Sequence, residues 1–72
     1  QSRDVLEALQ ALAPERRAAL VLVAIEGFSY AEAANTLGIP AGTLMSRISR
    51  GRDELRARLD GTYRRRSIRV VE

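Results

Sequence analysis

Apolar residues recur at helical spacing in four segments of the chain, and the breaks between these segments contain proline or glycine. In the first segment, Val5, Leu6, Leu9 and Leu12 mark one face at steps of three and four. The pattern predicts a helix over residues 3–11 with a single apolar side.

A second helix is predicted from Pro14 to about Ile25. Proline suits the first position of a helix, and Gly27 stands where a C-terminal glycine belongs. Residues 18–25 are apolar without interruption, as in a buried strand, but the whole segment is long for a strand. Because a helix that is apolar all round must be covered, we expect this one at the centre of the core.

A capping box predicts the start of the third helix. Ser29 and Glu32 have the S-x-x-E spacing in which each side chain accepts a hydrogen bond from the backbone N–H of the other residue. Gly38 is expected to end the helix in the left-handed conformation, with a turn of a few residues before the next helix. The inner face of this third helix carries residues expected in the core or the turn: Tyr30, Ala33, Ala34 and Leu37.

The fourth helix is predicted from Pro40 to Leu59, with Asp60 and Gly61 ending it. Its inner stripe consists of Leu44, Ile48, Gly51, Leu55 and Leu59. A glycine in that stripe is expected where another helix comes close. Residues 60–72 are expected to form a flexible basic tail. The predicted fold is an all-α, winged-helix-like, small four-helix domain that contains a helix-turn-helix and no sheet.

Composition excludes several classes of function. The 72 residues make one small domain that contains no cysteine and no histidine, so thiolate chemistry and the commonest general base and metal ligand are missing. No apolar run approaches the roughly 18 residues of a membrane span. We therefore expect no enzyme, no catalytic residue, no metal, no cofactor, no small-molecule substrate and no membrane contact, and a cytoplasmic location. Because the chain begins at Gln1 without methionine, we expect a piece of a longer protein.

Charge is distributed unevenly. Residues 1–32 contain three arginines and five acids, for −2, whereas residues 33–72 contain nine arginines and four acids, for +5. Every basic residue is arginine, whose planar fork suits phosphates and guanine edges. A genome rich in G and C would give the same arginine-only composition, so both explanations stay open.

The outer side of the fourth helix holds the candidate binding residues. Its periodicity directs four side chains outward together: Met45, Ser46, Ser49 and Arg50. Serine and arginine are good donors to phosphates and base edges, and a helix preceded by a tight turn can enter the major groove of DNA. Arg52, Arg56 and Arg58 are phosphate neighbours or surface ion-pair partners, and Glu54 and Arg58 have the spacing of a helical ion pair.

Residues 12–59, about two thirds of the chain, resemble region 4 of bacterial sigma factors, most of all the extracytoplasmic-function (ECF) group. The resemblance is carried by the proline before the second helix, by EGFSYAEAA, by LGIP-x-GT and by SRISRGRDELR, in that order. Several independent motifs in the right order are far more specific than a lone helix-turn-helix pattern.

The resemblance implies that residues 1–59 read the promoter −35 element within an RNA polymerase sigma factor and direct transcription initiation. It implies base contacts by Met45, Ser46, Ser49 and Arg50, and backbone contacts by Thr43, Arg47 and Arg52. Partners would be double-stranded promoter DNA, the β flap of the polymerase core on apolar surface of the first two helices, and anti-sigma factors. The implied location is the bacterial cytoplasm, on the nucleoid when bound to polymerase.

Met45 departs from the family pattern, in which lysine or arginine is common at this place. Methionine cannot donate a hydrogen bond, although it can contact a thymine methyl group. Two alternatives to promoter reading stay open. One is a protein-interaction module that mainly binds the β flap or an anti-sigma factor, and the other is a transcriptional regulator of the response-regulator type.

Overall fold

The structure, a computed structural model, describes residues 2–71, with side chains from residue 3 to residue 61. Four α-helices and one π-helical turn account for its regular structure, and no strand occurs between residues 2 and 71. The elements are α1 (Ser2–Ala11), α2 (Pro14–Leu20), η1 (Val21–Ile25), α3 (Tyr30–Leu37) and α4 (Ala41–Val71). The prediction of an all-α, four-helix domain without a sheet is confirmed.

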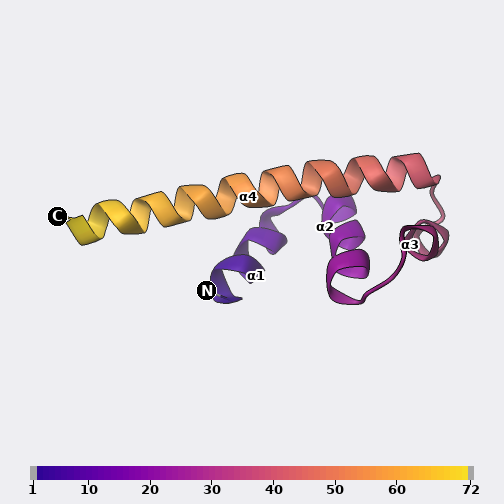
Figure 1. The fold of residues 1–72 in the computed structure, drawn as a ribbon, viewed down its shortest axis with the longest axis horizontal. Helices are drawn as coiled ribbons and strands as arrows, with labels where there is room; N and C mark the ends of the chain where they lie inside the picture. Colours follow the sequence, from indigo (N-terminus) through magenta and orange to yellow (C-terminus); the bar gives the residue numbers. More distant parts are fainter. Residues whose placement is uncertain (1, 72) are drawn as a thin grey trace.

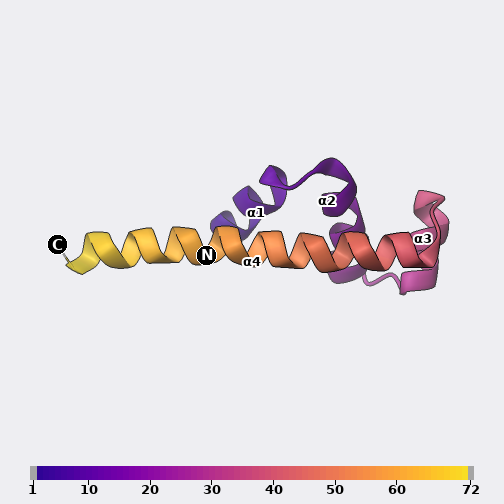
Figure 2. The ribbon, with the colours of Figure 1, turned by 90° about the horizontal axis from the view of Figure 1, so that it is seen from above.

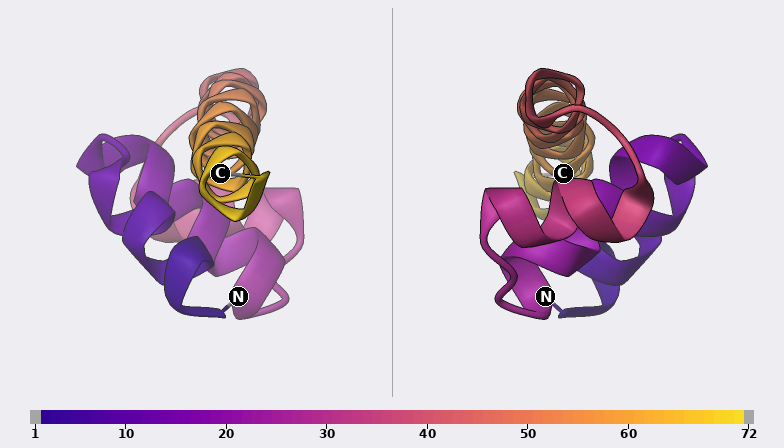
Figure 3. Two further views of the ribbon diagram at one scale, coloured as in Figure 1. Left: turned by 90° about the vertical axis from the view of Figure 1, so that its left-hand side faces the viewer. Right: turned by 90° about the vertical axis from the view of Figure 1, so that its right-hand side faces the viewer.

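Helix α4 is a long rod, and α1, α2 and α3 all lie on one side of it (Figures 1 and 3). Seen from above, α2 and η1 pass beneath α4 at a steep angle, and α3 lies under its N-terminal end (Figure 2). The 31 residues of α4 span about 46 Å at roughly 1.5 Å per residue. Since the molecule measures 49 × 18 × 16 Å, this one helix sets its long dimension.

The core lies where the three shorter helices meet the N-terminal half of α4. Every helix contributes apolar side chains to it, and Leu44 and Ile48 of α4 are its largest fully buried members. The core cluster comprises Leu9, Leu12, Ala19, Leu20, Ala33, Ala34, Leu44 and Ile48. The predicted inner stripe of α4 is confirmed, because Gly51 is also buried and Leu55 and Leu59 are half-buried.

Gly51 marks the closest approach between α2 and α4. A Cβ atom at this position would lie 2.9 Å from Leu20 Cδ1, 3.3 Å from Leu20 Cγ and 3.5 Å from Arg16 Cβ. A side chain at this position would therefore force Leu20 to shift, whereas glycine allows the two helices to cross at this distance. The sequence prediction that another helix comes close to Gly51 is confirmed.

The predicted capping box begins α3. The Ser29 hydroxyl accepts a hydrogen bond from the Glu32 backbone N–H at 3.1 Å, and the Ser29 N–H donates to Glu32 Oε1 at 2.8 Å. The hydrogen bond from the Ser29 backbone N–H is the main reason why the pKa of the Glu32 carboxyl lies below its usual value, and the Ser29 side chain also lowers it. Gly38 ends α3 with φ 68°, in the left-handed conformation predicted for it. Three residues, 38–40, then connect α3 to α4.

The second helix differs from its prediction in two respects. It changes to π-helical geometry at Val21, where the Glu26 N–H donates to the Val21 carbonyl at 2.9 Å, five residues back. It is also not buried throughout, since Val21–Val23 are half-buried and Ile25 is 62% exposed. The helix points away from α4, so its first part contributes Ala19 and Leu20 to the core, whereas Leu22 and Val23 of η1 pack against that core and stay half-buried.

The end of α4 was predicted at Asp60 and Gly61, and this is wrong, because the helix runs on to Val71. A glycine inside a helix costs only about 1 kcal/mol relative to alanine, which neighbouring helix formers offset. The side chains of the predicted tail beyond residue 61 lie outside the described residues. The flexibility expected of residues 60–72, and the division of the chain at residue 59, stay predictions.

Candidate nucleic-acid interface

Four candidate base-contacting side chains share the exposed side of α4. Met45, Ser46, Ser49 and Arg50 are all exposed, and Met45 keeps 53% of its surface accessible. We call these four residues the outer face. The residues that alternate with them on the helix, such as Leu44 and Ile48, are buried in the core. The outward projection predicted from the periodicity is confirmed.

The outer face is held by a rigid support. Ala33 and Ala34 of α3 are buried in the same cluster as Leu44 and Ile48 of α4, so α3 packs directly behind the N-terminal half of α4. The fixed cap of α3 and the short turn at Gly38 determine how α4 leaves α3. This is the arrangement of a helix-turn-helix, in which the second helix is presented to DNA.

The three residues predicted to contact the DNA backbone lie at different places around α4. Thr43 and Arg47 are half-buried on its flanks, whereas Arg52 is exposed. Arg47, Arg50 and Arg52 take part in none of the ion pairs found among the described residues. Their guanidinium groups are therefore free to meet phosphates or base edges.

Tyr30 joins this surface, although the sequence assigned it to the core or the turn. It is 38% exposed at the start of α3. A groove of about 290 Å³ separates it from α4. The groove is lined by Tyr30, Met45, Ile48, Ser49, Arg52, Asp53 and Arg56. The one sequence feature that goes with this exposure is the position of Tyr30 directly after the cap residue, because side chains of the first turn tilt toward the free N-terminal end of the helix.

An ion-pair network fixes α4 against α2. Glu54 accepts hydrogen bonds from Arg16 at 2.8 Å and from Arg58 at 3.3 Å. The bond from Arg16 is the main reason why the pKa of Glu54 lies below its usual value, and Arg58 adds to it. The Glu54–Arg58 pair was predicted from its spacing. The partner 38 residues away was not, because sequence spacing gives no indication of contacts between helices.

An apolar groove of about 430 Å³ lies between the second helix and α3. Its lining consists of Pro14, Arg17, Ala18, Val21, Leu22, Thr36 and Leu37. All these residues come from α2, η1 and α3. This groove includes the second helix, as expected, together with α3, whereas α1 contributes apolar surface outside the groove through Val5, which is 39% exposed, and Leu6, which is 58% exposed.

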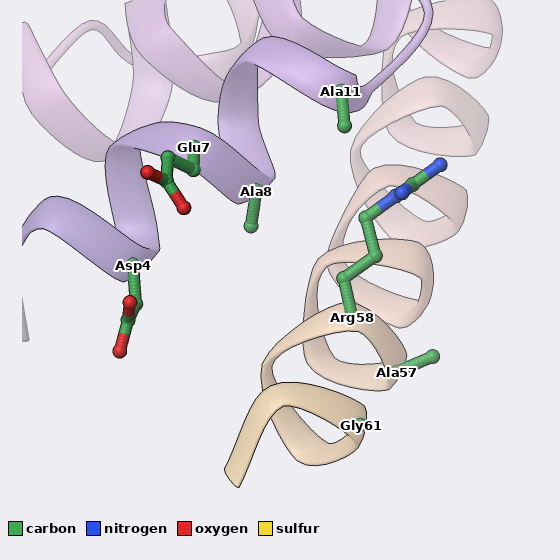
Figure 4. Close-up of a pocket in the computed structure, with 7 residues that line it drawn as sticks. All are labelled: Asp4, Glu7, Ala8, Ala11, Ala57, Arg58 and Gly61. Carbon is green, nitrogen blue, oxygen red and sulfur yellow. The ribbon is translucent and has the colours of Figure 1, made fainter. Parts of the chain in front are cut away.

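A further cleft, of about 270 Å³, separates α1 from the part of α4 near Gly61 (Figure 4). Asp4 and Glu7 of α1 stand on one side of it, opposite Arg58 of α4. Because carboxylates repel phosphates and Arg58 is already paired with Glu54, this cleft does not extend the nucleic-acid interface.

The described side chains offer little for other chemistry. Among residues 3–61, no group of three or more carboxylate, histidine or cysteine side chains could hold a metal ion. None of the described helices has the length and hydropathy needed to cross a membrane.

The fold and the outer face together define a helix-turn-helix protein of the kind that presents one helix to DNA. A family model described as "Sigma-70, region 4" matches residues 2–55. The chain belongs to this family. The resemblance identified from the sequence motifs is thereby confirmed, and the response-regulator alternative is not favoured.

Named relatives agree with this assignment. The chain is 57% identical over 53 residues to the ECF RNA polymerase sigma factor SigE of Mycolicibacterium smegmatis, covering 74% of this chain and 21% of that protein. It is 46% identical over 52 residues to the ECF RNA polymerase sigma factor EcfG of Rhodopseudomonas palustris, covering 72% of this chain and 29% of that protein. The chain thus spans between a fifth and a third of the length of these relatives.

One similar solved structure is the co-crystal structure of the sigma factor RpoE in complex with the anti-sigma factor NepR from Bartonella quintana. The TM-score is 0.76 at 40% sequence identity, over 79% of this chain and 36% of that one. The helix arrangement described above is therefore also that of a solved sigma factor.

Proposed function

We propose that this domain binds the −35 element of promoter DNA as region 4 of an ECF sigma factor, and so directs RNA polymerase to start sites in the bacterial cytoplasm. The observation that carries the proposal is the outer face itself. A donor-bearing set of exposed side chains stands on a helix that α3 supports from behind. Membership of the sigma-70 region 4 family agrees with it.

The outer face is assigned to the base edges. Ser46, Ser49 and Arg50 can donate to acceptors in the major groove, and Met45 can make an apolar contact there. Thr43, Arg47 and Arg52 flank or follow this face along α4, where a helix lying in the groove meets the phosphates. The unpaired guanidinium groups of Arg47 and Arg52 supply the positive charge that such contacts need.

The test starts with a library of DNA duplexes that contain a randomised central segment. The 72-residue chain is expected to enrich one short sequence, and its affinity for that duplex should fall as salt rises. Arg50→Ala is expected to relax the preference at one base pair by about 1–3 kcal/mol. Arg52→Ala, the matched variant, is expected to weaken all duplexes alike and to reduce the salt slope by about 1.

The outcomes separate the possible errors. If Arg50→Ala weakens all sequences equally, Arg50 binds phosphate and its assignment to the bases is wrong. If the chain enriches no sequence, promoter reading by this domain is rejected, even where binding to all duplexes weakens with salt, because such binding is non-specific.

A second part of the proposal concerns the apolar groove between the second helix and α3. We propose that the β flap of the polymerase core docks there, because an exposed apolar groove on a small domain is typical of a protein-interaction site. Anti-sigma factors are proposed as competitors for this domain, since a solved relative was crystallised with one.

The groove is tested with Val21→Glu, which places a charge in its lining, and with Ile25→Glu as the matched control. Ile25 belongs to the same π-helical turn but is 62% exposed and lies outside the lining. Calorimetric titration with a β-flap fragment should show binding lost in Val21→Glu and kept in Ile25→Glu, with duplex binding unchanged in both. Equal binding by the two variants would place the flap elsewhere.

A further inference from the structure

The N-terminal part of α4, which includes Met45, Ser46 and Ser49 of the outer face, has no exposed charged residue. From Ala41 to Ser49 the exposed residues are Ala41, Gly42, Met45, Ser46 and Ser49, and the first exposed charged residue is Arg50. Arg47 falls within this stretch, but it is half-buried on the flank. Because the N-terminal part of a recognition helix makes most of the base contacts, the first base pairs meet an uncharged surface.

Met45 is the longest side chain on this uncharged surface. It is the one large hydrophobic residue exposed on the described part of α4, at 53% of its surface. A thioether has no proton to donate, and holding it against the acceptors of guanine would leave those acceptors without their water partners. The major groove displays one apolar group that it can meet favourably, which is the C5-methyl group of thymine.

The helical turn before Met45 favours an apolar contact. One turn earlier, Gly42 has nothing within 4 Å of the place where a Cβ would be, so the DNA can approach α4 closely there. Met45 also lines the groove between Tyr30 and α4, whose other lining residues are Ile48, Ser49, Arg52, Asp53 and Arg56. The helical turn that precedes Met45 contains no carboxylate or guanidinium, so the charged residues of this groove all lie farther along α4.

We propose that Met45 reads the C5-methyl group of a thymine in the −35 element, so that this domain selects one base pair by an apolar contact instead of a hydrogen bond. The inference rests on the proposed function, because it requires the outer face to lie in the major groove. It goes beyond that function in naming the chemical group that is recognised. Arg50, which lies about two turns after Gly42 on α4, keeps its proposed role of donating hydrogen bonds to the base edges.

The test removes that group alone. In the duplex selected by the 72-residue chain, each thymine is replaced in turn by uracil, which lacks only the C5-methyl group. At one position the affinity should fall about fourfold, as expected for one methyl group returned to water. Met45→Ala should bind the thymine and uracil duplexes equally at this position, and Met45→Leu should restore most of the difference.

Two controls keep the test specific. Ser46→Ala, on the same face, should leave the fourfold effect of uracil in place, which shows that the coupling belongs to position 45. Met45→Arg should move the preference at this base pair from thymine to guanine.

The inference is overturned if no uracil substitution changes the affinity, or if the loss is the same in Met45→Ala as in the parent chain. Either result leaves the proposed function intact, because the chain would still select its duplex. If the parent chain selects no duplex, both the proposed function and this inference fail.

Discussion

At the scale of single residues, Gly51 determines how closely α2 can pack against the recognition helix α4. The distance of 2.9 Å between its missing Cβ and Leu20 Cδ1 is shorter than real contacts allow. Leu20 is itself buried, at 4% exposure, so its side chain can move away only within the packed core. The packing of α2 on α4, and with it the orientation of the outer face, depends on the absence of a side chain here.

Gly51→Leu should therefore destabilise the domain by about 1–3 kcal/mol, because the added atoms must displace Leu20 or separate the helices. Gly42→Leu is the matched control on the same helix, since nothing lies within 4 Å of its Cβ position. The control should be neutral, or stabilising by up to about 1 kcal/mol through its helix propensity. Urea unfolding followed by circular dichroism measures both. Equal unfolding midpoints for the two variants would contradict the close crossing.

Residues whose role depends on local chemistry were predictable from the sequence. The capping box at Ser29 and the left-handed glycine at position 38 act within a few residues of backbone, and both are found as predicted. The partnership of Arg16 with Glu54 joins positions 38 residues apart and was not predictable. The partial exposure of Tyr30 depends likewise on how α3 meets α4.

At the scale of elements, α4 combines two parts with different surroundings. Its N-terminal half packs on the three shorter helices, whereas the part beyond α1 extends past them (Figure 1). The helical period predicted the inner stripe correctly because packing enforces it. It placed the end of the helix wrongly because glycine only weakens a helix, and the strong helix formers at positions 55–59 precede this weak point.

The continuity of α4 through Gly61 can be measured. Gly61→Ala should stabilise the helix by about 0.5–1 kcal/mol, since nothing lies within 4 Å of its Cβ position and alanine has the higher helix propensity. Gly61→Pro should remove helical signal from the far-ultraviolet circular dichroism while the unfolding midpoint of the core stays unchanged. A proline variant with the full helical signal would show that the helix ends before this residue, as the sequence first indicated.

The second helix shows a different limit of sequence patterns. An unbroken apolar run predicts burial, but it has no alternation of apolar and polar positions that would reveal the helical period. It therefore cannot indicate the change to π-helical geometry at Val21. Because η1 leads away from α4, Ile25 is exposed at the end of this run. For the same reason, Val21 and Leu22 line the apolar groove. Apolar surface of this kind is what a partner protein can cover.

At the scale of the whole molecule, charge and shape agree. The outer face lies in the part of the chain with the net charge of +5, and α1 and the second helix lie in the part with −2. An elongated domain with a basic recognition helix is oriented in the field of DNA before it makes contact. The Arg16–Glu54 pair crosses between these two parts, which makes it a link between the support and the recognition helix.

That link makes the stability of the domain depend on pH in acid. The pKa of Glu54 is lower in the folded chain than in the unfolded one, chiefly through its hydrogen bond from Arg16, and the pKa of Glu32 is lowered by its bonds to Ser29. The ionised carboxylates therefore favour the folded state at pH values above the unfolded pKa of about 4.3. This contribution is lost as the pH falls through the lower folded pKa values, where both groups take up a proton.

Glu54→Gln should accordingly lower the Tm at neutral pH and flatten the fall of Tm between neutral pH and the acid range. Asp53→Asn is the matched control. It removes the same charge at the neighbouring position, and Asp53 takes part in none of the ion pairs of the described residues. Added salt should reduce the difference between the two variants, since both partners in the pair are partly exposed and screened by ions. Thermal unfolding across the acid range measures these effects, and identical pH profiles for parent and Glu54→Gln would show that the link contributes nothing to stability.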